Sequence, residues 1–133
     1  MMRKLFIAGN WKMYKNAAEA VALAAEVKKQ QAAFAAADVS ICPPFTALGA
    51  VGRELAGSAI AYGAQNMHWE GQGAYTGEIS PRMLVDLGCR YVIIGHSERR
   101  QYFGETNENV NKKIAAAFAH GILPIMCIGE TVQ

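Results

Sequence analysis

The chain has 133 residues, of which 52% are hydrophobic and 18% are charged, and its formal net charge is +2. This composition excludes a disordered chain and predicts a single domain, residues 1–133, around one buried core. The lysines and arginines are scattered, so we expect neither a nucleic-acid partner nor a membrane partner. No apolar run approaches the ~20 residues that a membrane-spanning helix needs.

The cysteines favour a reducing compartment. Cys42, Cys89 and Cys127 are odd in number and far apart, which fits reduced core thiols better than a disulfide framework. Residues 1–6 lack the long apolar segment of a secretory leader. We therefore expect a cytoplasmic protein.

Five short apolar runs predict buried strands along the chain, at residues 5–8, 39–42, 59–64, 91–94 and 122–128. Four helices are expected between them. The first starts at the capping-box pair Asn16 and Glu19 and keeps one apolar face as far as Phe34. The other helices are expected between the start and stop signals Thr46 and Gly57, Ser80 and Gly88, and Thr106 and Gly121. Lys112 and Lys113, in the last helix, are interpreted as a solvated face.

This alternation of strands and helices predicts a parallel α/β sheet with right-handed crossovers. A doubly wound sheet usually carries a glycine-rich phosphate loop after its first strand. Residues 9–12 instead contain one glycine and bulky side chains, so a partial (β/α)8 TIM barrel is preferred, with about four βα units and a fifth strand. In such a barrel, reactive residues lie at the carboxyl ends of the strands. Those ends carry Asn10, Lys12, Gln65, Asn66, His96 and Glu98.

His96 is the most informative of these residues. It extends the apolar face that Val92 and Ile94 form on the fourth strand, and Ser97 after it can cap a new helical turn. The positive end of the helix dipole would then disfavour an imidazolium. The pattern predicts a neutral imidazole that acts as a hydrogen-bonding electrophile.

Five motifs resemble the triosephosphate isomerase family in order and spacing: Gly9–Met13, Gly63–Asn66, Gly73–Glu78, Ile94–Arg100 and Cys127–Glu130. The resemblance covers the whole chain but only the amino-terminal half of the family's fold, since a typical barrel has roughly 250 residues. We therefore expect that a carboxyl-terminal half is missing from this chain and is needed to complete the site.

The resemblance implies an enzyme of glycolysis and gluconeogenesis that interconverts dihydroxyacetone phosphate and glyceraldehyde 3-phosphate through an enediolate. It implies no metal and no organic cofactor. Lys12 and His96 would be catalytic, and Asn10 would bind the substrate together with Lys12. The residues expected to support them are Glu98, Ser97 and Gln65.

The family's catalytic base is a glutamate from the loop after the sixth strand, and its lid and glycine-rich phosphate turns also follow the fifth strand. Neither Glu98 nor Glu130 matches the motif of that base. Without a positioned base, proton abstraction loses a factor of ~10²–10⁴. We therefore expect the 133-residue chain alone to be essentially inactive.

Residues 67–79 are too many for a simple turn between a strand and a helix. The resemblance implies that this segment enters a second subunit of a homodimer, with Thr76 reaching toward the partner subunit's Asn10 and Lys12. Tyr75 and Arg99 are counted with Thr76 as dimer contacts, and Arg99 is also expected to brace the neighbouring loops.

Two other functions stay open. The chain could be a free-standing half-barrel, a structural or assembly module with a vestigial site. It could also belong to another sugar-phosphate barrel enzyme, although the block Gly95–Arg100 argues against that alternative.

Overall fold

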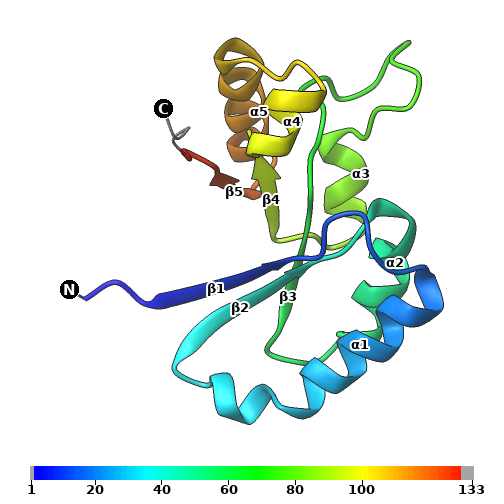
Figure 1. Cartoon of the computed structure of the whole chain (residues 1–133), viewed down its shortest axis with the longest axis vertical. Coiled ribbons are helices and arrows are strands. Elements are labelled where there is room, and N and C mark those ends of the chain that lie inside the picture. The colour runs from blue at the N-terminus through cyan, green and yellow to red at the C-terminus, as the bar shows by residue number, and fades with distance from the viewer. Residues whose placement is uncertain (1, 130–133) are drawn as a thin grey trace.

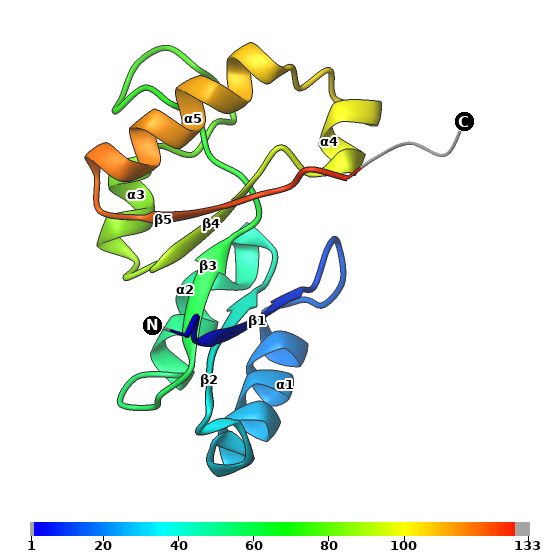
Figure 2. The same ribbon diagram turned by 90° about the vertical axis from the view of Figure 1, so that its left-hand side faces the viewer.

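The computed structural model describes residues 2–129, and within them five strands form one parallel sheet (Figure 1). The strands are β1 (Leu5–Asn10), β2 (Ala37–Cys42), β3 (Ala61–Ala64), β4 (Tyr91–Ile94) and β5 (Leu123–Met126). Each strand pairs in parallel with the next one in the sequence. The sheet curls as it proceeds from β1 to β5, as Figure 2 shows. The predicted partial (β/α)8 barrel is therefore confirmed.

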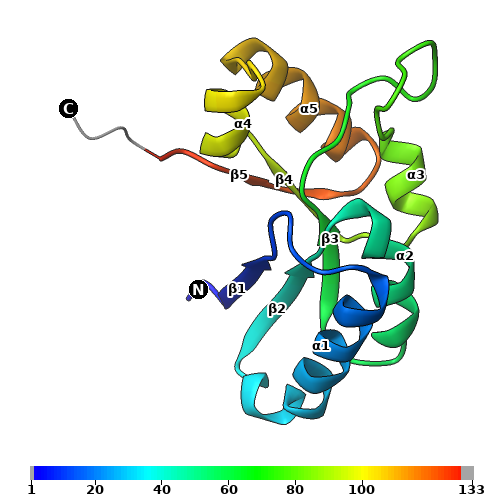
Figure 3. The ribbon, with the colours of Figure 1, turned by 45° about the vertical axis from the view of Figure 1, so that its right-hand side comes forward.

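The helices lie on the outer side of the curved sheet, and its inner side stays open (Figure 3). They are α1 (Ala17–Lys29), α2 (Phe45–Glu54), α3 (Pro81–Asp86), α4 (Ser97–Tyr102) and α5 (Asn107–Ala119), with a short 3-10 helix η1 (Gln31–Phe34) after α1. Within the described residues, none of these helices has the length and apolar character that crossing a membrane requires.

Two apolar clusters hold the helices on the sheet. In one, Ala20 and Ala24 of α1 pack with Ile41 of β2 and Val51 of α2. The other cluster joins α3 and α5 to β4 and contains Leu84, Val92, Ile94, Val110 and Ala117. Tyr62 of β3 contacts both clusters, so the two halves of the sheet share a continuous core.

Most helix boundaries follow the predicted caps. The capping box of Asn16 and Glu19 is present, and the side chains of Ser80 and Thr106 cap α3 and α5. The predictions for the end of α1 and the start of α2 were wrong. The first helix does not reach Phe34, because α1 ends at Lys29 and the chain tightens into η1. Nor does Thr46 cap α2, which starts one residue earlier, directly after Pro44.

The prediction of five buried strands holds only for the middle of the sheet. In β4 every residue is buried, whereas Leu5 and Ile7 of β1 are 62% and 48% exposed and Leu123 of β5 is 42% exposed. The reason is topological, because β1 and β5 are the two edges of the described sheet. Their apolar side chains lack the neighbouring strand that would cover them.

Between β3 and β4 the backbones approach so closely that only glycine fits at one position. A Cβ atom on Gly63 would lie 2.5 Å from the carbonyl oxygen of Tyr91. Because Gly63 pairs with Tyr91, the first residue of β4, this close approach lies between the carboxyl end of β3 and the amino end of β4.

Candidate active site at the carboxyl ends of the strands

A cavity of about 310 Å³ opens at the carboxyl ends of β1, β3 and β4. The polar residues that sequence analysis placed at this rim all line it: Asn10, Lys12, Gln65, Asn66, His96 and Glu98. Parallel pairing explains the convergence, because it brings the carboxyl ends of all five strands to one edge of the sheet. Sequence analysis missed two aromatic residues that also line the cavity, Phe45 and Phe103. Phe45 comes three residues after the end of β2, which was an available signal, whereas Phe103 comes nine residues after the end of β4, beyond α4, and had no such signal.

Lys12 adopts a backbone conformation that is rare for a side chain with a Cβ atom. Its φ is +55°, in the left-handed region, which costs roughly 1 kcal/mol for a residue other than glycine. The side-chain oxygen of Asn10 accepts a hydrogen bond from the Lys12 amide at 2.9 Å. The turn after β1 is therefore held by the last residue of the strand itself.

The Lys12 ammonium forms an ion pair with Glu98 across the cavity. Its Nζ atom lies 2.6 Å from Glu98 Oε1, and the two side chains are 49% and 42% exposed. The hydrogen bond from Lys12 and its charge hold the pKa of Glu98 below its ordinary value, and Glu98 in turn raises the pKa of Lys12. Both groups are therefore charged at neutral pH, which places a fixed cation beside the cavity.

His96 is itself the N-cap of α4, so the prediction that Ser97 caps this turn was wrong. The His96 Nδ1 atom accepts a hydrogen bond from the Glu98 amide at 3.1 Å. Gly95 makes this junction possible, since its φ is +73° and a Cβ there would lie 3.0 Å from Val110. Because Nδ1 accepts a hydrogen bond, the proton of a neutral His96 ring is on Nε2.

Ser97 is the first residue of α4 and its side chain is exposed, outside the set that lines the cavity. Arg99 does line the cavity, with its guanidinium 5.1 Å from the centre of the Phe103 ring. Its Nε atom lies 3.6 Å from Glu105, so Arg99 connects α4 to the loop that follows.

The solvated face predicted for Lys112 and Lys113 was wrong for Lys113. This lysine is 5% exposed, donates to Asn66 Oδ1 at 2.8 Å and forms an ion pair with the buried Glu105. Its position had a signal in the sequence, because Lys113 falls on the same face of α5 as the apolar residues Val110 and Ala117. The buried pair anchors Asn66 at the cavity wall.

The long segment 67–79 carries Tyr75 and Thr76 away from the cavity of their own chain. Both residues are exposed, and the loop projects beyond α3 in Figure 1. A hydrogen bond of 2.8 Å from the His68 amide to the Ile79 carbonyl closes its base. The His68 ring stacks on Trp69 at a centroid distance of 4.2 Å and meets the tilted Tyr75 ring at 4.6 Å, so the loop packs on itself.

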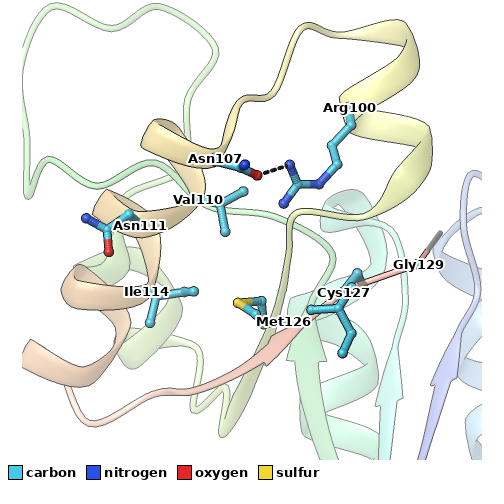
Figure 4. A pocket seen from close by; sticks show the side chains of 9 residues that line it. Arg100, Asn107, Val110, Asn111, Ile114, Met126, Cys127 and Gly129 are labelled. Carbon is cyan, nitrogen blue, oxygen red and sulfur yellow. Dashed lines mark hydrogen bonds between the residues drawn. The ribbon is translucent and has the colours of Figure 1, made fainter. Parts of the chain in front are cut away.

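A larger cavity of about 450 Å³ lies between α5 and β5, but its chemistry differs (Figure 4). Its floor is formed by apolar residues such as Val110, Ile114 and Met126. Among the lining residues within 2–129, Arg100 is the one with a cationic side chain, and it already donates to the Gly95 carbonyl and to Asn107. Since this cavity borders the edge strand β5, we assign it to packing at the sheet edge and place the candidate site at the smaller cavity.

The cysteines do not take part in the site chemistry. All three are free, as predicted, and Cys42 and Cys89 are buried. Burial raises the pKa of Cys42 to about 11 and that of Cys89 to about 12. Both are protonated thiols at neutral pH and therefore poor nucleophiles.

Comparison with known proteins agrees with the resemblance seen in the motifs. Residues 5–133 match the family described as triosephosphate isomerase. The chain is 58% identical to the triosephosphate isomerase of Carboxydothermus hydrogenoformans over 99% of this chain and 53% of that protein. It is 56% identical to that of Chloroflexus aurantiacus, over 98% of this chain and 52% of that protein. The chain thus spans about half the length of the curated relatives it matches.

The ion pair predicts a measurable change in the titration of Glu98. In Lys12→Met, the pKa of Glu98 is expected to rise toward that of an ordinary glutamate, because its hydrogen-bond donor and opposite charge are lost. The contribution of the ion pair to the free energy of unfolding is fully present above the ordinary pKa of glutamate. It is lost as the pH falls through the lowered pKa of Glu98 in the folded chain. NMR titration of the Glu98 carboxyl carbon measures the change. Lys4→Met, which removes the partner of Asp38, is the control that leaves Glu98 unchanged.

Proposed function

The chain belongs to the triosephosphate isomerase family, and from that premise we propose that it carries the electrophilic side of an isomerase site. In the closed barrel, this site interconverts dihydroxyacetone phosphate and glyceraldehyde 3-phosphate through an enediolate. The observation that carries the proposal is the convergence of Lys12 and His96 on one cavity from the ends of two different strands.

His96 polarises the substrate. Its Nδ1 atom is engaged by the Glu98 amide, so a neutral ring presents its Nε2 proton as a hydrogen-bond donor. Donation to the carbonyl oxygen stabilises the negative charge that develops there when the neighbouring carbon loses its proton. Reprotonation at the former carbonyl carbon, with transfer of a proton from the hydroxyl oxygen to the former carbonyl oxygen, exchanges the carbonyl and the hydroxyl group between the two carbons.

Lys12 supplies the positive charge. It is charged at neutral pH, since Glu98 raises a pKa that ordinarily lies well above 7, and its ammonium lies at the rim of the cavity. There it attracts the phosphate of the substrate and offsets the charge of the enediolate. Asn10, beside it on the rim, orients both Lys12 and the substrate.

Glu98 is a poor candidate for the base that removes the carbon-bound proton. Its pKa is held below the ordinary value by the hydrogen bond with Lys12, and a weaker base accepts a proton less readily. Among the cavity residues within 2–129, Glu98 is the one carboxylate. We infer that the base, together with the lid and the phosphate-binding turns, comes from later βα units of the family's barrel.

The pathway and the cellular compartment of the enzyme are proposed from its substrates and its cysteines. Triose phosphates are intermediates of glycolysis and gluconeogenesis, and we propose that the reaction takes place in the cytoplasm. The free cysteines Cys42, Cys89 and Cys127 agree with a reducing compartment.

The isomerase proposal predicts different activities for two polypeptides. The 133-residue chain alone is expected to show no turnover above its own His96→Ala variant, because a positioned base contributes ~10²–10⁴-fold. The complete barrel is this chain continued by the part of the Carboxydothermus hydrogenoformans relative that it does not cover. It is expected to isomerise triose phosphates in a coupled assay and to lose ~10²–10⁴-fold in kcat/KM on His96→Ala.

Either of two results would change the proposal. Turnover by the 133-residue chain that disappears in His96→Ala would show that a base is already present in the half-barrel. A folded but inactive complete barrel would contradict the isomerase proposal and favour the half-barrel module with a vestigial site.

We also propose that the complete barrel is a homodimer whose contact includes the loop 67–79, with Arg99 beside it. The loop is closed at its base and exposes Tyr75 and Thr76, which suits insertion into a partner. In this arrangement Thr76 reaches the partner subunit's Asn10 and Lys12.

The dimer proposal predicts that Thr76→Arg weakens self-association of the complete barrel at least about tenfold, because the charged side chain cannot be accommodated in the contact. Sedimentation equilibrium measures the dissociation constant. Phe118→Arg, on the exposed side of α5, is the control and should leave it unchanged. Equal dissociation constants for Thr76→Arg and the parent would exclude the loop from the interface.

A further inference from the structure

Gln65, the first residue after β3, donates its side-chain amide to two backbone carbonyls. Its Nε2 atom lies 2.8 Å from the Lys12 carbonyl oxygen and 2.9 Å from the Cys42 carbonyl oxygen. A single side chain therefore joins the carboxyl ends of β1, β2 and β3. Both of its bonds go to backbone rather than to another side chain, so Gln65 acts on the conformation of its partners.

The bond to Lys12 completes a pair of contacts around that residue. The Asn10 side chain accepts from the Lys12 amide at 2.9 Å, and Gln65 donates to the Lys12 carbonyl. The residue between these two contacts has a φ of +55°. Lys12 is thus held on both sides, by amide side chains from two different strands, in a conformation that lysine seldom adopts.

The two carbonyls do not depend on Gln65 equally. The Cys42 carbonyl also accepts from the Trp11 amide at 3.0 Å, so it keeps a donor when Gln65 is changed. The Lys12 carbonyl, in contrast, loses its contact with the end of β3, which lies two strands away in the sheet. The principal effect of removing the Gln65 amide therefore falls on Lys12.

We propose that Gln65 is a positioning residue that holds the Lys12 backbone in its left-handed conformation and thereby aims the ammonium at Glu98 and the cavity. A left-handed residue directs its Cα–Cβ bond differently from an extended or helical one, so relaxation of φ turns the whole side chain. The 2.6 Å ion pair with Glu98 then loses its geometry. The catalytic consequence rests on the proposed function, whereas the structural consequence does not.

The test compares Gln65→Met with the parent in the complete barrel. Methionine has similar length and volume but cannot donate a hydrogen bond. If Gln65 aims Lys12, the Glu98 carboxyl titrates at a higher pH in Gln65→Met, as it does in Lys12→Met. A glutamine that only supports the fold would leave this titration unchanged. Gln101→Met, at an exposed position of α4, is the matched control.

The same variant also has a catalytic readout. We expect kcat/KM to fall about tenfold in Gln65→Met and by less than twofold in Gln101→Met. An inactive parent barrel would overturn the proposed function, while the Glu98 titration would still decide the role of Gln65.

If Gln65→Met does not fold, Gln65→Asn is the second variant. It retracts the donor by one methylene and is expected to raise the pKa of Glu98, as Gln65→Met would. An unchanged Glu98 titration in the folded variant overturns the inference.

Discussion

The candidate site depends on the parallel pairing of the strands. The register of β1 on β2 pairs Asn10 with Cys42, and the β4 register places Ile94 beside Met126, so every strand ends at the same rim. Groups that lie far apart in the sequence, such as Lys12 and Glu98, then come within 2.6 Å of one another. The backbone of each strand end already places these residues at the cavity. The apolar clusters behind the sheet keep the strands in this register.

Backbone constraints at two strand ends then orient the reactive side chains. After β1, Lys12 is held at φ +55°, and after β4, Gly95 at φ +73° places His96 as the N-cap of α4. The ion pair between Lys12 and Glu98 is partly exposed, so its main contribution is orientation and charge at the cavity rather than stability. The pKa of Glu98 is held below its ordinary value, which makes Glu98 a weaker base. In the proposed function, these groups stabilise negative charge, and proton abstraction is assigned to later βα units of the family's barrel.

Much of this arrangement could be predicted from the sequence, since strand periodicity and the polar residues after each strand are local signals. The errors have physical causes. Ser97 is a better cap by residue type, yet the turn after Gly95 brings the His96 ring to the Glu98 amide. Lys113 was interpreted as solvated because lysine seldom lies in a core. Its ion-pair partner Glu105 lies before the start of α5, so helix spacing alone does not identify the pair. The left-handed φ of Lys12 has no signal in residue type, because it arises from contacts between strand ends.

The most direct test of the account is the tautomer of His96, read from the ¹⁵N NMR spectrum of its ring in the complete barrel. The Glu98 amide donates to Nδ1, so that in a neutral ring Nε2 carries the hydrogen, which in the proposed function faces the substrate. The predicted result is that the neutral form of the ring carries its proton on Nε2. A proton on Nδ1 would break the cap of α4 and remove the donor from the cavity, and it would contradict the central claim that this strand end is built to stabilise a developing oxyanion.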